Sequence, residues 1–257
     1  MATPSLQSLE RGLAILKALN QIPGMGIDSL AAMLQLSRGT TYRLLETLRR
    51  DGYITRDGGR GKYAVTERVL CLSDGCRAAG ELQDQAQPVL DDLSARYRWP
   101  VAIATPDGAD MVLRATTDHK TPYVKRRYST GSRRPMLFCS SGRVYLAHCN
   151  TAHREAMLSL LETLPINKEP LRAKHRDELA RLLSGIQREG YSAYENAEHV
   201  TTLSVPIYKE EKVAGALLMR YFSSTMNVST ACERILPGLK QAANRISGTA
   251  QRSQRAA

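Results

Sequence analysis

Residues 36–65, LSRGTTYRLLETLRRDGYITRDGGRGKYAV, constrain the fold of this chain more than any other segment. Small hydroxyl side chains come first, leucines at helical spacing follow, and two short β-type runs then surround a glycine-rich tip. Leucines at three- and four-residue steps predict a helix with one apolar face, and Ser37 is a good residue to cap it. The runs 53–55 and 62–65 around residues 57–61 predict a β-hairpin.

Two shorter helical patterns precede this unit. Leucines recur at helical steps over residues 5–20, where Ser5 is an N-cap residue and Pro23 follows as a stop signal. A second helix is expected to begin at Asp28, again an N-cap residue. Three short helices followed by a basic hairpin make a winged helix-turn-helix, whose third helix lies in the DNA major groove. We predict such a domain over residues 1–75.

The third helix and the hairpin supply the residues expected to contact DNA. Small hydroxyls at a helix start permit close approach to bases, and cations contact phosphates. Each charge taken singly is explained as well by a solvated helix face, but the order and spacing of the set favour DNA. A protein-interaction adaptor that uses the fold without DNA is the alternative. The expected DNA-binding residues are Ser37, Arg38, Thr40, Thr41, Tyr42, Arg43, Arg49, Arg50, Arg60 and Lys62.

Composition excludes several other classes of protein. The net charge of +11 suits a polyanionic partner, although the excess is not concentrated in the first 75 residues. No run of eighteen apolar residues predicts a membrane span, and the N-terminus lacks a secretion signal. The five cysteines have no zinc-type spacing. We therefore expect reduced thiols, a cytoplasmic location, and neither metal nor cofactor.

No pattern of catalytic residues is present. Ser140, Ser141 and His148 lie close in sequence, but no G-x-S-x-G turn and no well-placed acid accompany them. The other histidines are spread along the chain, and no phosphate-binding glycine loop occurs. We predict that the chain is not an enzyme.

The remainder of the chain reads as an α+β sheet domain. Residues 76–98 are expected to form a linker helix and then, starting at Pro88, the first helix of the second domain, because proline suits a first helical position. The domain itself is expected over residues 99–250, with a disordered tail at 251–257. Its expected elements are two strands around the turn 106–108, a strand with a turn over 120–132, helices 152–164 and 176–189, a hairpin around 209–212 and a closing helix over 229–247.

Two motifs resemble a known family. SLERGLAILKALN and LSRGTTYRLLETLRRDGY, at residues 8–20 and 36–53, resemble the DNA-binding domain of the IclR family of bacterial transcriptional regulators. The resemblance implies a winged helix-turn-helix joined by a linker helix to a GAF-like α/β effector-binding domain. It also implies operator DNA as partner and homodimers that pair into tetramers. The surplus of leucines in residues 5–20 independently suggests a dimer contact.

The end of the chain looks most like one branch of that family. Residues 217–247, LLMRYFSSTMNVSTACERILPGLKQAANRIS, resemble the MhpR-type branch, whose members respond to aromatic acids from phenylpropionate and hydroxybenzoate breakdown. This resemblance implies control of aromatic catabolism by an aromatic carboxylate, with RNA polymerase as a partner if the protein is an activator. A regulator of central-carbon genes that senses a small keto acid is the alternative. The family usually has glycine at the position of His199.

Residues 131–147 and 190–207 resemble the units that line the effector pocket of the family. On the strand 216–221, Ala216, Leu218 and Arg220 share one face, and an inward arginine is a natural anchor for a carboxylate. The alternatives are a salt bridge from Arg220 to Glu195 or Glu198, and a solvated edge for Arg126. The expected effector-binding residues are Met111, Tyr123, Arg126, Cys139, Ser140, Ser141, Thr202, Leu218 and Arg220.

Overall fold

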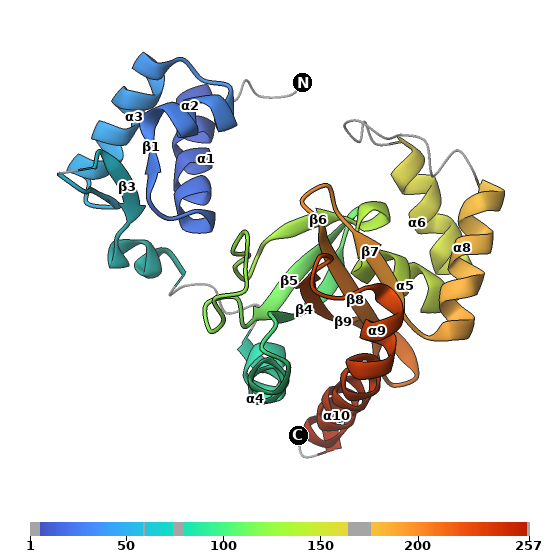
Figure 1. Cartoon of the computed structure of the whole chain (residues 1–257). Helices are drawn as coiled ribbons and strands as arrows, with labels where there is room; N and C mark the ends of the chain where they lie inside the picture. Colours follow the sequence, from blue (N-terminus) through green and yellow to red (C-terminus); the bar gives the residue numbers. More distant parts are fainter. Residues whose placement is uncertain (1–5, 59, 74–79, 164–175, 256–257) are drawn as a thin grey trace. The chain divides into compact units, whose positions relative to one another are not determined.

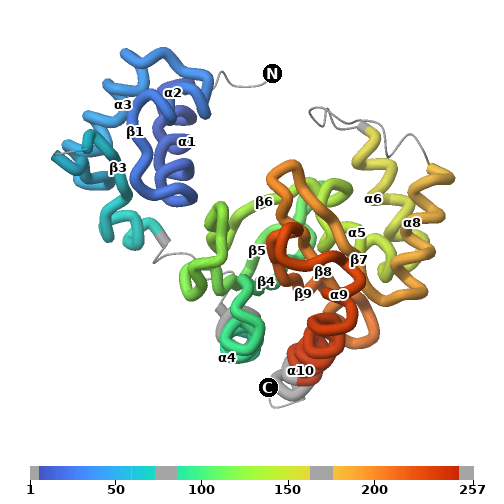
Figure 2. Tube along the Cα trace, viewed as in Figure 1, coloured from blue at the N-terminus to red at the C-terminus, as the bar shows by residue number. Residues whose placement is uncertain are grey.

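The computed structural model of the chain describes residues 6–58, 60–73, 80–163 and 176–255. The chain divides into two compact units after Ala78, and each is described by itself. Figure 1 labels their elements and Figure 2 traces the chain through both. The predicted boundary at residues 75–76 lies outside the described residues. Across the described ranges, no helix is long and apolar enough to cross a membrane.

The N-terminal unit is the predicted winged helix-turn-helix. Three helices enclose a small core that includes Ile15, Leu19, Leu30 and Leu45, and a three-stranded sheet closes it. Tyr63 of the wing is buried in the same core. The elements are α1 (Gln7–Gln21), β1 (Met25–Gly26), α2 (Ile27–Leu34), α3 (Arg38–Arg50), β2 (Ile54–Arg56) and β3 (Lys62–Val65), with sheet order β1-β3-β2 and a 3-10 helix η1 (Glu67–Ser73) after the wing.

The starts of two helices differ in detail from the prediction. Helix α1 begins after Leu6, and Ser5 lies outside the described residues. Helix α2 is preceded by Gly26 in extended conformation, so the prediction of Asp28 as its N-cap is wrong: Asp28 lies in the first turn. There its negative charge still interacts favourably with the positive end of the helix dipole.

The C-terminal unit contains a six-stranded antiparallel sheet with helices on both faces, which confirms the predicted α+β class (Figure 1). Alternate residues of each strand face opposite sides, so Val101 and Ile103 pack under α4 and α10, whereas Ala102 and Ala104 pack with α5. The sheet order is β6-β5-β4-β9-β8-β7. The elements are α4 (Gly80–Tyr97), β4 (Val101–Asp107), β5 (Asp110–Thr116), β6 (Arg133–Pro135), η2 (Met136–Phe138), α5 (Ser140–His148), α6 (Thr151–Thr163), α8 (Arg176–Glu189), β7 (Ser192–Glu195), β8 (Val200–Lys209), β9 (Lys212–Phe222), α9 (Val228–Arg234) and α10 (Leu236–Arg255).

Three helix predictions for this unit are wrong. The linker and first domain helix are one continuous helix, since α4 runs through Pro88 without a break. The closing helix is instead two helices, α9 and α10, which meet at Ile235. Pro237 lies in the first turn of α10, where a missing N–H is tolerated. Helix α10 continues to Arg255, so residues 251–255 do not form the predicted disordered tail.

The predicted strand over residues 120–132 is also wrong, because residues 117–132 form an irregular strap between β5 and β6. Its two ends bond to the backbone of β4 and β5, and side chains bind several N–H groups between them. The Tyr128 N–H donates to Asp118 Oδ2 at 2.7 Å, and the Tyr123 N–H donates to Thr121 Oγ1 at 3.3 Å. The strap therefore has a defined path without belonging to the sheet.

Candidate functional site

The start of α3 is fixed by its own hydroxyl groups. Ser37 Oγ accepts a hydrogen bond from the Thr40 N–H at 3.2 Å, which confirms Ser37 as the N-cap, and donates to Thr40 Oγ1 at 2.9 Å. Ser37 remains exposed and Thr40 half-buried. A capped helix start presents its first turn in one orientation, as a helix that enters a DNA groove requires.

Thr41 is a correction to the predicted DNA-binding set. Its side chain is fully buried in the core between the helices, and its hydroxyl donates to the Ser37 carbonyl at 3.0 Å. A buried residue without free hydrogen-bonding groups cannot reach a base or a phosphate. Thr41 therefore supports the helix, whereas Tyr42 and Arg43 on the next positions are exposed.

The predicted cations of this unit lie at its surface. Arg38 pairs with Asp28 at 3.4 Å and Arg50 with Asp51 at 3.7 Å, and all four side chains are more than half exposed. Such pairs contribute little and exchange readily for other partners. Arg49 donates to both carboxylate oxygens of Glu46, a contact that lowers the pKa of that carboxyl below its usual value. The other predicted cations, Arg43, Arg60 and Lys62, are also exposed.

Arg56 is a cation on this surface that sequence reasoning missed. It ends β2, and its guanidinium lies 5.7 Å from the ring centroid of Tyr63. Together with Arg38 and Tyr42 it lines a hollow of about 380 Å³ between α3 and the wing. Its position directly before the glycine-rich tip could have identified Arg56 from the sequence, since cations on both strands of the wing can face the same side.

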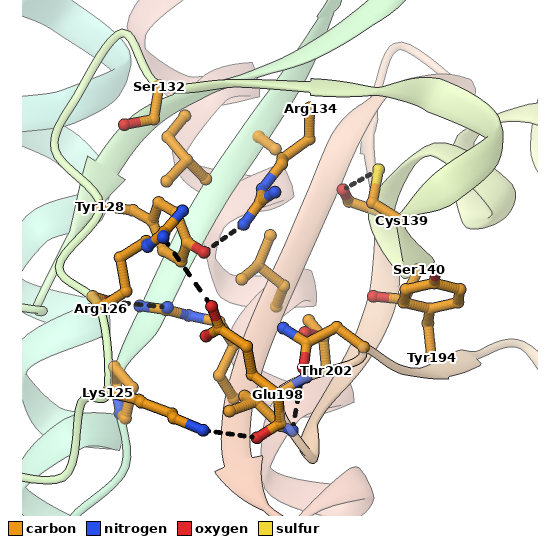
Figure 3. A pocket seen from close by; sticks show the side chains of 18 of the residues that line it. Lys125, Arg126, Tyr128, Ser132, Arg134, Cys139, Ser140, Tyr194, Glu198 and Thr202 are labelled. Carbon is orange, nitrogen blue, oxygen red and sulfur yellow. Dashed lines mark hydrogen bonds and ion pairs between the residues drawn. The ribbon is translucent and has the colours of Figure 1, made fainter. Parts of the chain in front are cut away.

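The C-terminal unit contains a cavity of about 260 Å³. Strands β4, β5, β8 and β9, the start of α5 and the strap enclose it, and Figure 3 shows the side chains that point into it. Ala104, Leu113 and Phe138 form part of an apolar wall. All nine residues predicted for effector binding line this one cavity: Met111, Tyr123, Arg126, Cys139, Ser140, Ser141, Thr202, Leu218 and Arg220.

The start of α5 is held tightly against the cavity. A Cβ at Gly142 would collide with the Met136 carbonyl, so only glycine lets the helix approach this closely. Ser140 Oγ lies 2.7 Å from Ser204 Oγ on β8, and Ser141 Oγ donates to Cys139 Sγ at 3.3 Å. Burial raises the pKa of the Cys139 thiol, so it stays protonated. The positive end of the α5 dipole nevertheless favours a negatively charged ligand at this end of the helix.

Arg220 lies on the predicted face of β9, but its charge is already compensated. Its guanidinium forms a hydrogen-bonded ion pair with Asp118, and the two side chains are 12% and 3% exposed. It also lies 4.6 Å from the ring centroid of Tyr128. Arg220 lines the cavity, as predicted, and its ion-pair partner is Asp118 rather than Glu195 or Glu198.

Arg134 is a cavity residue that the prediction omitted. It is the middle residue of the short strand β6, and its guanidinium lies 4.6 Å from the Tyr128 ring centroid, where it donates to the Tyr128 hydroxyl. No carboxylate of the described residues pairs with it. The neighbouring Arg133, by contrast, binds Asp107 and Asp110 at 2.7 and 2.9 Å outside the cavity. Because successive residues of a strand face opposite sides of the sheet, the two arginine side chains point in different directions.

The strap also brings charges to the cavity. Lys125 Nζ donates to the Glu198 carbonyl at 3.3 Å, and Arg126 Nη2 lies 3.9 Å from Glu198 Oε1 (Figure 3). His199, at the usual glycine position, has φ of 56°. Its exposed ring bonds Glu195 at 3.0 Å and does not line the cavity. Histidine therefore keeps the left-handed turn without contributing to the ligand site.

Two family models match nearly the whole chain. The IclR helix-turn-helix domain matches residues 8–58, and the bacterial transcriptional regulator IclR C-terminal domain matches residues 78–248. The chain is 25% identical to the transcriptional regulator KdgR of Escherichia coli, over 95% of this chain and 92% of that protein. It is 27% identical to the Pca regulon regulatory protein of Pseudomonas putida, over 90% and 76% of the two chains.

Solved structures share the fold at lower identity. IclR of Thermotoga maritima matches with a TM-score of 0.63 and 18% identity, over 96% of this chain and 99% of that chain. An IclR homolog from Microbacterium hydrocarbonoxydans, solved with 4-hydroxybenzoate, matches with a TM-score of 0.57 and 23% identity, over 95% and 99%. These relatives do not distinguish the MhpR-type branch, which stays a prediction. The chain belongs to the IclR family and is a DNA-binding transcriptional regulator, not an enzyme.

Proposed function

We propose that this regulator binds a small aromatic carboxylate in the cavity of its C-terminal unit, and that the ligand changes its affinity for operator DNA. The observation that carries the proposal is a largely apolar cavity, partly open to solvent, with cationic residues along its boundary. Ligand pockets typically combine apolar walls with a few polar groups that fix orientation. The genes under its control are then those of aromatic-compound catabolism.

The cavity suits one ring better than a short aliphatic acid. Its volume of about 260 Å³ is just below the range of pockets for drug-sized ligands. Met111, Leu113, Phe138 and Leu218 offer apolar surface that a keto acid of two or three carbons would leave uncovered. Among the solved relatives, one holds 4-hydroxybenzoate. Because a sequence identity of 23% supports only a shared fold, the proposal of an aromatic ligand rests on the residues that line the cavity.

Arg134 is the residue best suited to bind the carboxylate. Asp118 already compensates the charge of Arg220, whereas Arg134 has no acidic partner among the described residues. It lines the cavity together with Ser141 and Cys139 at the start of α5. The helix N–H groups and the guanidinium would both favour an anion at this side.

Operator binding is assigned to the exposed surface of α3 and the wing. Arg43 and Tyr42 on α3 would read base edges, and Arg60 and Lys62 on the wing would contact phosphates. All four side chains are exposed, which supports these roles. A second copy of the chain is the expected partner of α1. Leu6, Leu9 and Leu13 follow one another at helical spacing and are 71%, 60% and 46% exposed. A dimer would cover this apolar stripe and present two recognition helices.

Calorimetric titration with benzoate, 4-hydroxybenzoate and pyruvate tests the ligand. We expect binding of the aromatic acids but not of pyruvate, and a loss of about tenfold or more in Arg134→Gln, since a charge-assisted hydrogen bond is lost. Arg133→Gln is the matched control because Arg133 does not line the cavity. If only pyruvate binds, the ligand of this regulator is a small keto acid and not an aromatic acid.

Coupling to DNA is tested with operator fragments that the protein itself selects from random sequences. The affinity for DNA should change when the bound acid is added, and by linkage the affinity for the acid should change by the same factor when DNA is added. A ligand that binds equally well with and without operator would contradict the regulatory part of the proposal.

A further inference from the structure

The strap side of the cavity holds a hydrogen-bond donor that the fold leaves unused. Arg126 Nε is buried and has no hydrogen-bond partner among the residues that the structure describes. Arg126 lines the cavity. Nε itself is covered by neighbouring atoms, so a ligand would meet the adjacent Nη2 of the same guanidinium, which forms no hydrogen bond among the described residues.

A carboxylate that can accept a further hydrogen bond lies beside that donor. Glu198 Oε1 is 3.9 Å from Arg126 Nη2, an ion-pair distance that is too long for a hydrogen bond. The Glu198 side chain is 37% exposed and lines the cavity. Its carboxylate can therefore accept a hydrogen bond from a ligand without breaking one within the protein.

The backbone, rather than the ion pair, fixes the position of Glu198. Asn196 Oδ1 accepts hydrogen bonds from the N–H groups of Glu198 and Val200 at 2.9 and 3.1 Å. Lys125 Nζ donates to the Glu198 carbonyl from the strap. The turn between β7 and β8 is thereby held against the strap, and the acceptor stays beside the donor when the ion pair is weak.

A donor next to an acceptor is complementary to a hydroxyl group, which both accepts and donates. A carboxylate only accepts, and at this place it would face the like charge of Glu198. Figure 3 shows Lys125 and Glu198 at one side of the cavity and Arg134 and Cys139 at another. The carboxylate and the hydroxyl of one ring would thus meet different residues.

We infer that Arg126 and Glu198 together recognise a hydroxyl group on the ring of the bound acid, and that Glu198 excludes ligands with a second carboxylate there. Arg126 Nη2 donates to the hydroxyl oxygen, and the hydroxyl donates to Glu198. This inference rests on the proposed function, which places the acid group near Arg134. It makes the ligand a phenolic monocarboxylate rather than an unsubstituted or dicarboxylic aromatic acid.

Titration of the full-length protein with benzoate, 3- and 4-hydroxybenzoate and terephthalate tests the inference. One of the hydroxybenzoates should bind about tenfold more tightly than benzoate, because a hydrogen bond to a charged acceptor contributes at least that factor. Glu198→Leu should abolish this advantage. Glu198→Gln, which keeps the shape but removes the charge, should reduce the advantage and strengthen terephthalate binding. Glu195→Gln is the control, since Glu195 pairs with His199 away from the cavity.

The outcomes separate the two proposals. If wild-type protein binds none of the four acids, the proposed function fails and this inference fails with it. If the acids bind but Glu198→Leu keeps the preference for a hydroxyl, only this inference is overturned. It is likewise overturned if Glu198→Gln tightens benzoate itself, because the ligand carboxylate would then compete with Glu198 for Arg126.

Discussion

Each unit contains an ion pair between an arginine and an aspartate, but one pair is exposed to solvent and the other is buried. Arg38 and Asp28 lie 3.4 Å apart with side chains 73% and 74% exposed, whereas Arg220 and Asp118 bond each other at 12% and 3% exposure. An exposed pair contributes between zero and about 1 kcal/mol and leaves its cation available to phosphate. A buried pair cannot be opened cheaply. The N-terminal unit thus leaves the charge of Arg38 accessible to a partner, whereas the C-terminal unit commits Arg220 to Asp118 beside its cavity.

Removal of one buried partner should have the largest effect. Asp118→Ala leaves Arg220 buried without its acid and also removes acceptors for the Thr116 hydroxyl and the Tyr128 N–H. We expect a loss of about 3–5 kcal/mol in the free energy of unfolding of the C-terminal unit. Denaturant unfolding followed by the fluorescence of Trp99 measures it, because Trp99 is the single tryptophan and lies in that unit.

Asp28→Ala is the control for the exposed pair and should change the stability of the N-terminal unit, measured by hydrogen exchange of its helix amides, by less than about 1 kcal/mol. A similar small loss in Asp118→Ala would remove the contrast between the two units. Arg220 would then be free to bind a ligand carboxylate, as the sequence first suggested.

The difference between the units also decides what could be predicted. Repeats and caps within one segment specify the three helices and the hairpin of the winged helix. The two-residue strand β1, the 3-10 helix η1, the start of α2, the burial of Thr41 and the cation Arg56 were missed. The alternation along β9 placed Leu218 and Arg220 toward the cavity correctly. The partner of Arg220, however, is Asp118, 102 residues away. No local pattern encodes such a contact, and the strap that contains Asp118 has no period because it forms neither a helix nor a strand.

Loss of a side chain that contacts DNA bases should produce the next largest effect. Arg43 is exposed on α3, so Arg43→Ala should weaken binding to the selected operator by about 1–3 kcal/mol if its guanidinium contacts a guanine. Binding to random DNA should fall much less. Fluorescence anisotropy titrations with both DNAs at one salt concentration give the ratio of the two affinities. Equal losses on both would show that Arg43 contacts only the backbone.

The cap of α3 should have an intermediate effect on both folding and DNA binding. Ser37→Ala removes the acceptor of the Thr40 N–H and should cost about 1 kcal/mol of helix stability. Because Trp99 does not report on this unit, hydrogen exchange of the α3 amides is the suitable measurement. Ser37→Asp, which keeps a capping acceptor, should restore protection; if it does not, capping is not the role of this side chain.

The smallest expected effect concerns a single phosphate contact on the wing. Lys62 is exposed on β3, and its removal in Lys62→Ala should weaken all DNA sequences alike. The dependence of log K on log salt should become shallower by about one, since one fewer counterion is released. Lys209→Ala, an exposed lysine of the C-terminal hairpin, should leave the slope unchanged. A slope that stays constant in Lys62→Ala as well would place the wing away from the DNA backbone, and the cations of α3 would then account for the electrostatic part of binding.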